Sequence, residues 1–261
     1  TTILIQGDDL NDLVTTANGE LRLLDDWLCC NKLSLCVSKT KCLIFGNRSH
    51  DHEVRLIMRD TEIEIVESHE ILGIIFDDRL SFNVFISQLI RSLSKTYGIM
   101  RKVSYFVPKA VLRTMYNSLF LPKMCYGIEI WGSSSIGLLN RVRRLQKRAL
   151  KLFICSNETV KSVLTFDELY SYFVTVKLHQ YHVGHRSDYF DNILSSMLPS
   201  HLYETRHASY DGINTPCVKK SKSYSSFMYN SISFWNKLPL SLRSITSLSS
   251  FKVTLKKYLL Q

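Results

Sequence analysis

Lysine and arginine side chains are concentrated in one stretch of the sequence. Residues 91–151 hold 13 of them against a single acid, Glu129, which gives this segment a net charge of +12. Residues 1–90 have a net charge of −7 and residues 152–261 one of +5, within a chain whose total is +10. Such block asymmetry is typical of a polyanion-binding face beside a differently employed region, and nucleic acid is the commonest polyanionic partner.

The run from Arg141 to Lys151 places its charges on one side of a predicted helix. At 100° per residue from Arg141, a basic sector between about 200° and 340° holds Arg143, Arg144, Lys147, Arg148 and Lys151. An apolar sector between about 20° and 100° holds Leu138, Val142, Leu145, Ala149 and Leu152. Phosphate binding needs several cations along a rigid rod, so we predict that Arg141 and the basic sector contact nucleic acid. The alternative is a solvated helix face, although such faces normally mix both signs.

Gly7-Asp8-Asp9 raises the question of a metal site, since adjacent carboxylates after a strand hold the magnesium ions of two-metal polymerases. A catalytic hairpin of that type needs an apolar strand directly after the pair. Here Leu10-Asn11-Asp12-Leu13 begins a helical pattern instead. We therefore favour the alternative, in which these aspartates cap a helix N-terminus and complement its dipole.

The spacing of histidines and cysteines indicates no metal centre. His179, His182 and His185 recur every third residue, which spreads them over about 120° of a helix, so we expect them on the helix surface. The 7 cysteines include no Cys-x-x-Cys pair and fit neither a disulfide framework nor a tetrahedral zinc site. We interpret them as the reduced thiols of an intracellular protein.

Composition and periodicity predict an α+β fold. The chain is 45% hydrophobic and 21% charged, as in globular proteins, and no apolar run approaches the roughly 18 residues of a membrane helix. Apolar residues at three- and four-residue spacings predict one long helix over residues 10–31. Short apolar or alternating runs predict a small antiparallel sheet under this helix, from Thr1–Ile5, Leu33–Val37, Cys42–Phe45, Val54–Met58, Glu62–Val66 and Ile71–Phe76.

From residue 82 onward the pattern is helical. Apolar spacing predicts a three-helix bundle over residues 82–153, with Pro108 in the first turn of the second helix. Further helices are expected over residues 167–185 and 249–260, and a Ser/Lys-rich loop over residues 219–226.

Five short motifs follow one another along nearly the whole chain. They are Asn31–Leu35 with Lys39–Phe45, Ile71–Asp77, Tyr126-Gly127 with Trp131-Gly132, Leu145–Lys151, and Phe234–Pro239 with Ser250–Lys252. In type and in order they resemble segments of the reverse transcriptases of non-long-terminal-repeat retrotransposons, of the LINE-type, jockey-like group. Cys36 departs from the pattern, because the family usually has Asn at that place.

The resemblance implies a right-hand polymerase. Residues 1–80 would be the end of the palm with its primer grip, residues 81–155 a basic helical thumb, and residues 156–261 a C-terminal extension. The family's metal-binding aspartates would lie just before Thr1, so we expect the chain to be a segment of a longer protein. By the same reasoning, Mg²⁺ belongs to the intact parent enzyme, and this segment is expected to bind none.

The resemblance also assigns roles. Lys39 matches the family's motif lysine, which acts beside the leaving pyrophosphate as a charge stabiliser or proton donor. Lys41, Leu72 and Gly73 would contact nucleic acid, with Leu72-Gly73 bringing backbone close to the primer end. The implied partners are an RNA template and a DNA primer, and the implied location is the cytoplasm and nucleus. The alternative is a non-catalytic nucleic-acid-binding module derived from such an element.

Overall fold

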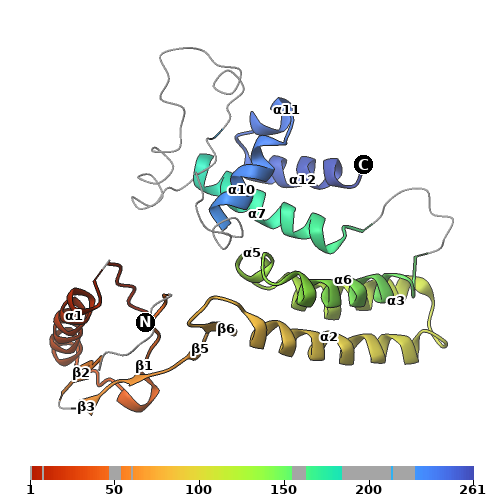
Figure 1. Ribbon diagram of the computed structural model, residues 1–261. Helices are drawn as coiled ribbons and strands as arrows, with labels where there is room; N and C mark the ends of the chain where they lie inside the picture. The colour runs from red at the N-terminus through yellow and green to blue at the C-terminus, as the bar shows by residue number, and fades with distance from the viewer. Residues whose placement is uncertain are drawn as a thin grey trace, which may run out of the picture. The chain divides into compact units, whose positions relative to one another are not determined.

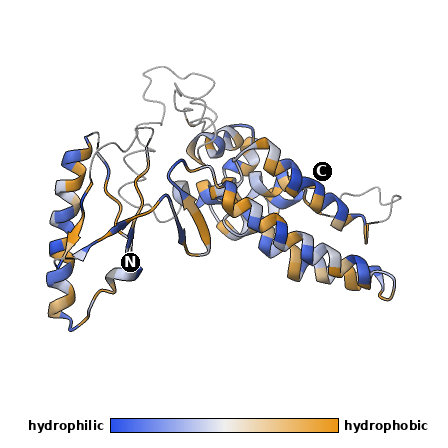
Figure 2. Ribbon diagram, turned by 60° about the horizontal axis from the view of Figure 1, so that its bottom comes forward, coloured by the Kyte–Doolittle hydropathy of each residue, from blue (hydrophilic) through white to orange (hydrophobic). Residues whose placement is uncertain are grey.

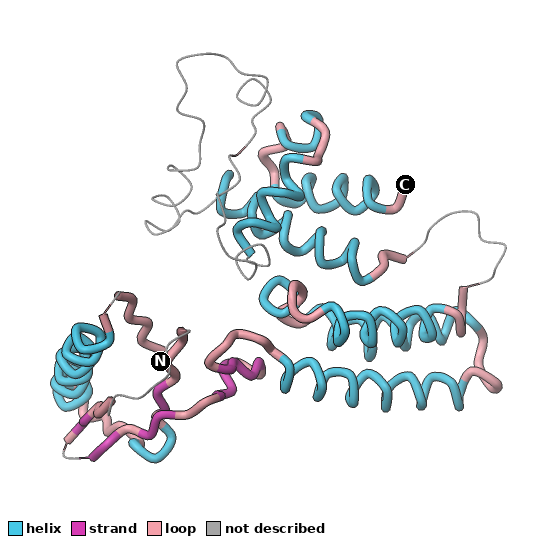
Figure 3. The backbone as a smooth tube through the Cα atoms, viewed as in Figure 1, coloured by secondary structure: helices cyan, strands magenta, loops and turns pink. Residues whose placement is uncertain are grey.

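The chain folds into two compact units, Thr1–Phe82 and Asn83–Gln261 (Figure 1). The computed structural model describes residues 2–7, 9–46, 54–59, 61–154, 163–183, 213 and 227–261. Helices dominate and the strands are few and short, so the α+β expectation is confirmed at this level (Figure 3). The regions expected as separate parts, residues 81–155 and 156–261, contribute their helices to one compact unit, Asn83–Gln261. None of the helices in the described ranges combines the length and apolarity that a bilayer crossing requires.

The first unit is built on α1 (Leu10–Cys30), the long helix that the apolar spacing predicts. The carboxylate of Asp9 caps it by accepting hydrogen bonds from the N–H groups of Asn11 and Asp12, at 3.0 and 3.2 Å. The capping prediction is therefore confirmed for Asp9, while Asp8 lies outside the described residues. The inner face of α1 joins a small buried cluster made of Leu28, Leu56, Met58 and Ile63.

Separate strand pairs replace the single antiparallel sheet that we expected in this unit. β1 (Lys41–Cys42) pairs in parallel with β4 (Glu64–Ile65). β2 (Ile57–Met58) pairs antiparallel with β3 (Thr61–Glu62), as expected for the neighbouring runs Val54–Met58 and Glu62–Val66. The expected strands at residues 1–5 and 33–37 are wrong, because residues 2–7 and 33–36 have no regular structure and η1 (Val37–Lys39) is a single 3₁₀ turn. Apolar alternation is not enough there, since a strand also needs a partner.

A second hairpin joins β5 (Ser68–Ile71) to β6 (Ile74–Asp77), where we expected one strand over residues 71–76. The turn residues Leu72 and Gly73 have φ values of 50° and 82°. Two successive positive φ values are the geometry that two-residue hairpins prefer, because it matches the twist of the strands. Leucine rarely adopts a positive φ, so the Leu-Gly pair gives no recognisable turn signal in the sequence.

Asp77 fastens the end of β6 to the residues that follow it. Its carboxylate accepts hydrogen bonds from the N–H groups of Ser81 and Phe82, at 2.6 and 3.2 Å, and from the hydroxyl of Ser81. Burial alone would raise the pKa of Asp77, but the hydrogen bonds from Ser81 and Phe82 outweigh it and hold the pKa below its ordinary value.

The second unit begins with the predicted three-helix bundle, whose apolar sides Figure 2 shows in orange. Its first helix is α2 (Asn83–Val103), and its third is α6 (Ile136–Leu150). The second is continuous through α3 (Lys109–Met115), the π-helical turn η2 (Tyr116–Phe120) and α4 (Leu121–Cys125). Pro108 is the N-cap of this helix, one position before the predicted first turn. The fully buried side chains of the bundle include Ile86, Leu93, Met100, Leu112, Tyr116, Phe120 and Met124.

Two glycines shape the connection between α4 and α6, which contains the short helix α5 (Ile128–Trp131). Gly127 has a φ of 58°, so a left-handed residue turns the chain there. A side chain at Gly132 would meet the carbonyl oxygen of Ile128 at 2.4 Å. Between them, Trp131 is fully buried, and its indole N–H donates to the carbonyl of Tyr126 at 2.8 Å.

The remaining helices form a second core in the same unit. α7 (Phe166–Val183) packs against α10 (Phe227–Asn236) and α12 (Leu248–Leu259), with α11 (Leu240–Arg243) between the last two along the chain. The helices expected over residues 167–185 and 249–260 are thus confirmed. The loop expected over residues 219–226 lies outside the described residues.

His179 lies inside this second core rather than on a helix surface. Its ring stacks on Phe251 with centroids 4.0 Å apart, and its Nε2 lies 2.6 Å from the carbonyl oxygen of Ile245. The surface expectation is therefore wrong for His179, because α12 covers that side of α7. The side chain of His182 and all of His185 lie outside what the structure describes.

Candidate nucleic-acid interface

The helix α6 has one face packed into the unit. It lies against α2 and α7, and the apolar sector predicted for it is turned inward. Its buried side chains are Leu139, Val142, Leu145, Gln146 and Ala149. Because these contacts fix the rotation of the helix about its axis, they also fix the direction in which its charged face points.

The other face of α6 carries exposed cations. They are Arg141, Arg144, Lys147, Arg148 and, directly after the helix, Lys151. No carboxylate of the described residues forms an ion pair with any of them. Within the helix, the Nε of Arg144 donates to the carbonyl of Asn140 at 3.1 Å. The five side chains therefore form a surface of one sign, which we call the α6 basic face.

Arg143 was predicted to belong to this surface, but it connects two helices instead. Its guanidinium donates to both carboxylate oxygens of Asp167 on α7, with N–O distances of 2.7–3.1 Å. It also donates to the side chain of Asn140 at 2.7 Å and lies 5.5 Å from the ring centre of Phe166. A guanidinium held in this way is occupied within the protein, so we exclude Arg143 from the α6 basic face.

Gln146 has a structural role on α6 that the sequence did not reveal. Its amide N–H₂ donates to the hydroxyl of Tyr116 at 3.1 Å and to the carbonyl of Leu164 at 3.0 Å. It is buried, although it stands in the middle of a basic run. Burial raises the pKa of Tyr116 to about 12, so this phenol stays neutral beside the amide. The pair ties α6 to the second helix of the bundle and to the segment before α7.

The predicted site residues of the first unit lie at two places. Lys41 forms an ion pair with Glu64 across the β1–β4 pair, and Lys39 is exposed at the end of η1. Leu72 and Gly73 form the tip of the β5–β6 hairpin, where the side chain of Leu72 is 85% exposed. Lys39 and Lys41 are two residues apart in the sequence, and Lys41 is paired while Lys39 is exposed.

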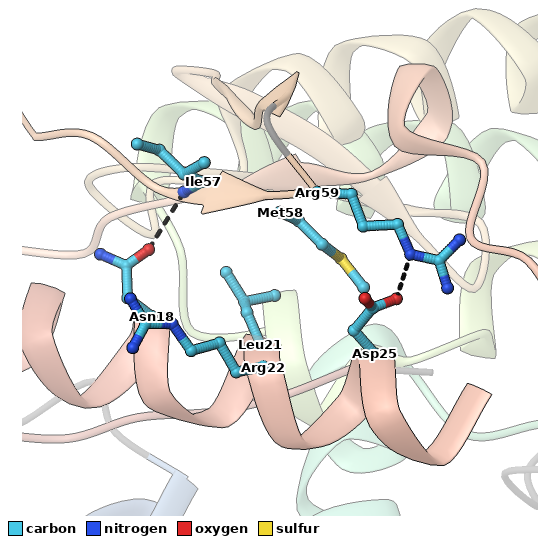
Figure 4. A pocket seen from close by; sticks show the side chains of 7 residues that line it. All are labelled: Asn18, Leu21, Arg22, Asp25, Ile57, Met58 and Arg59. Atoms are coloured by element: carbon cyan, nitrogen blue, oxygen red, sulfur yellow. Dashed lines mark hydrogen bonds and ion pairs between the residues drawn. The ribbon is translucent and has the colours of Figure 1, made fainter. Parts of the chain in front are cut away.

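A groove of about 350 Å³ lies between α1 and β2 in the first unit (Figure 4). The side chain of Asn18 accepts from the N–H of Ile57 at 3.0 Å and donates to the carbonyl of Arg55 at 3.2 Å, so it fastens the strand to the helix. At the other end, Arg59 forms an ion pair with Asp25. None of the predicted site residues lines this groove, and Asn18, Asp25 and Arg59 are used to join α1 to the β2 strand and its end.

The chain was compared with known proteins, and the comparisons gave no match. No family model matches the sequence, and neither a curated protein nor a solved structure matches it. Within the described ranges, no three His, Cys, Asp or Glu side chains gather in a way that could hold a metal ion. The α6 basic face is therefore the feature of the described residues with the clearest chemistry.

Proposed function

We propose that this chain binds template–primer nucleic acid through the α6 basic face. The observation that carries the proposal is the row of exposed cations on a helix whose opposite face is buried. At about 1.5 Å per residue, the distance along the axis from Arg141 to Lys151 is about 15 Å, which is enough to follow several phosphates of one strand. Cation–phosphate contacts position a protein on a duplex without reading its sequence, so little sequence preference is expected.

We further propose that the parent protein is an RNA-directed DNA polymerase of a non-long-terminal-repeat retrotransposon. The support is the resemblance of the five motifs, which include Leu145–Lys151 at the end of α6. In that setting the bundle would act as the thumb, and Lys39 would assist the departure of pyrophosphate. Mg²⁺ would be held by the parent enzyme, and since the carboxylate of Asp9 caps α1, we assign it no metal. The second candidate, a non-catalytic binding module, uses the same α6 basic face.

Binding is tested by removing charge from two helices in parallel. In the first variant Arg144, Arg148 and Lys151 are replaced by Ala; in the matched control Lys252, Lys256 and Lys257 of α12 are replaced by Ala. Fluorescence anisotropy with an RNA–DNA heteroduplex at several salt concentrations measures the affinity and its salt slope. We expect the α6 variant to lower the slope by about three units and the control to change it little. An unchanged slope in the α6 variant, or equal losses in both, would contradict the proposal.

Catalysis is tested separately from binding. The chain alone, supplied with Mg²⁺, a primed RNA and nucleotides, is expected not to extend the primer; template-dependent extension would contradict that expectation. In a longer protein that extends primers, Lys39→Ala is expected to lower the extension rate by roughly ten- to a thousandfold and to leave template affinity nearly unchanged. A loss of affinity as large as the loss of rate would make Lys39 a phosphate contact, and no loss in either would leave Lys39 as a solvated surface residue without a catalytic role.

A further inference from the structure

The turn between α2 and α3 presents two aromatic rings to solvent. Tyr105 is 79% exposed and Phe106 is 86% exposed, the highest fraction among the exposed large apolar side chains of the described residues. The two rings stand next to each other in sequence, between Val103 at the end of α2 and Pro108 at the start of the next helix. Nothing in the packing of the bundle requires aromatic side chains at these positions, since neither ring is buried.

The backbone under the two rings is held in a defined conformation. The N–H of Ser104 donates to Met100 at 2.9 Å, and the N–H of Phe106 donates to Val103 at 2.8 Å, so the turn continues the hydrogen bonding of α2. The hydroxyl of Ser104 donates to the carbonyl of Arg101 at 2.7 Å. Pro108, with a φ of −61°, then starts the next helix. A partner that binds these rings therefore loses little conformational entropy of the turn on association.

Cations surround this end of the bundle. Arg101 and Lys102 are exposed in the last turn of α2, directly before the aromatic turn. The end of α6 reaches the same region, because Phe153 packs on Tyr116 with ring centroids 5.4 Å apart and lies 5.9 Å from the guanidinium of Arg113. Lys147, Arg148 and Lys151 of the α6 basic face thus lie at the end of the bundle that carries the aromatic turn.

Within the described residues 83–154, the bundle that carries the aromatic turn has almost no negative charge. Between residues 83 and 154 the sequence contains one acid, Glu129. Glu129 belongs to α5, which lies at the opposite end of the bundle from the α2–α3 turn (Figures 1 and 3). Two exposed rings among the cations of this segment match a ligand that offers both flat apolar faces and phosphates.

We propose that Tyr105 and Phe106 form a stacking site for unpaired bases at the end of a duplex held by the α6 basic face. The inference rests on the proposed nucleic-acid binding and adds the form of its partner, a duplex with a single-stranded overhang. Stacking of bases on aromatic side chains is tolerant of sequence, and cations at the same end of the bundle neutralise the overhang's phosphates. An anionic membrane would also attract these cations, but surface-bound helices use a long apolar face, whereas this tip offers two adjacent rings.

The test compares two ligands and uses the full chain. One ligand is a blunt RNA–DNA duplex; the other is the same duplex with an overhang of about ten unpaired nucleotides, and affinities are measured by fluorescence anisotropy. In the double variant Tyr105→Ala/Phe106→Ala, affinity for the overhang ligand should fall by about ten- to a hundredfold, while affinity for the blunt duplex changes less than about twofold. Because both side chains are exposed, thermal unfolding followed by circular dichroism should be unchanged.

Two control variants separate stacking from other effects. Tyr105→Trp/Phe106→Trp keeps aromatic faces and should retain the overhang preference, and Ile136→Ala removes another exposed apolar side chain, 73% exposed, and should leave it intact. The proposal is overturned if wild type and the double Ala variant prefer the overhang equally. It is also overturned if the variant loses only binding to anionic phospholipid vesicles, which would make the tip a membrane contact. If wild type binds neither nucleic acid, the proposed function fails together with the stacking site.

Discussion

The two units of this chain are stabilised in different ways. In the unit Thr1–Phe82, the helix α1 has a single fully packed side chain, Leu28, and the strands are two to four residues long. In the unit Asn83–Gln261, Trp131 and Trp235 are completely buried together with several phenylalanines and a tyrosine. The first unit depends on polar links such as Asn18 to the β2 strand and Asp25 to Arg59, whereas the second depends on aromatic packing.

This difference shows where a binding surface can be held firmly. Long cationic side chains lose entropy when they are positioned, so a polyanion site benefits from a helix whose axis and rotation are already fixed. α6 has that support, because Gln146, Val142 and Ala149 are buried beneath its basic face. Lys39, in contrast, lies on a single 3₁₀ turn beside a two-residue strand.

The reactivity of cysteines should separate the two units most strongly. In the first unit, a hydrogen bond with the side chain of Ser38 and one from the N–H of Lys39 lower the pKa of Cys36. In the second, burial, aided by the charge of Glu129, raises the pKa of Cys125 to about 12. Iodoacetamide alkylates only the thiolate form of cysteine. At about pH 8 it should therefore modify Cys36 at least about a thousandfold faster than it modifies Cys125. Mass spectrometry of digested samples at several times measures both rates, and comparable rates would contradict the described burial.

Replacement of one tryptophan in each unit should give the next largest contrast. Trp131→Ala removes a fully buried ring and the hydrogen bond to the carbonyl of Tyr126, so it should lower the free energy of unfolding by about 3–5 kcal/mol. Trp27→Ala removes a ring that is 57% exposed on α1 and should cost less than about 1 kcal/mol. Urea unfolding followed by circular dichroism gives both values. Equal losses would mean that the cores of the two units are more alike than the packing shows.

The Arg143–Asp167 ion pair should have a moderate effect on stability and none on the salt slope. The two side chains are 34% and 64% exposed, so a double-mutant cycle with Ala at both positions should give a coupling of about 0.5–1 kcal/mol. Arg148→Ala should lower the salt slope of heteroduplex binding by about one unit, while Arg143→Ala should leave it unchanged. A slope change of about one unit for both arginines would return Arg143 to the α6 basic face.

Protonation of Asp77 should give the smallest effect, limited to the first unit. Its pKa is lowered in the folded chain, so its carboxylate stabilises the fold fully above the usual carboxyl pKa of about 4. That contribution is lost as the pH falls through the lowered folded value. Wild type should therefore lose its stability advantage over Asp77→Asn as the pH falls from about 5 to about 2. Amide hydrogen exchange of β5 and β6 measures the stability of the first unit in both proteins, and Asp78→Asn serves as the control. A stability difference between wild type and Asp77→Asn that stays constant across this pH range would contradict the lowered pKa of Asp77.

The helices could be predicted from the sequence because each carries a long apolar repeat. α1, α7 and α12 begin and end within a few residues of the predicted positions, and α2 and α6 lie within the stretch predicted for the bundle. Most strand bounds and pairings could not be predicted, because strands of two residues give too short a pattern. The parallel pairing of Lys41 with Glu64 also joins residues that are 23 apart. The hairpin at Leu72-Gly73 was missed for a local reason, since leucine seldom occupies a position with positive φ.

For the candidate site, the sequence predicted the direction of α6 but not the use of each residue on it. The wheel placed Arg143 at 200°, the edge of the basic sector, and the partner that occupies it, Asp167, lies on another helix. Gln146 reads as one more polar residue in a basic run, and only the packing of Tyr116 against α6 shows why an amide is needed there. The roles of Arg143 and Gln146 depend on contacts with residues distant in the sequence, and the spacing of residues along one helix cannot predict such contacts.

The π-helical turn η2 has a consequence for the register of its helix. The buried residues Leu112, Tyr116, Phe120 and Met124 are spaced by four, and in an α-helix at about 100° per residue the last would point about 120° away from the first. A π-turn accommodates one additional residue, or about 100° of that drift, so all four side chains stay on one side. Removal of one exposed residue, such as Ser118, would restore the usual alternation of three and four. The second helix of the bundle therefore corresponds to an ordinary amphipathic helix with a one-residue insertion, which the backbone takes up locally without displacing the buried face on either side.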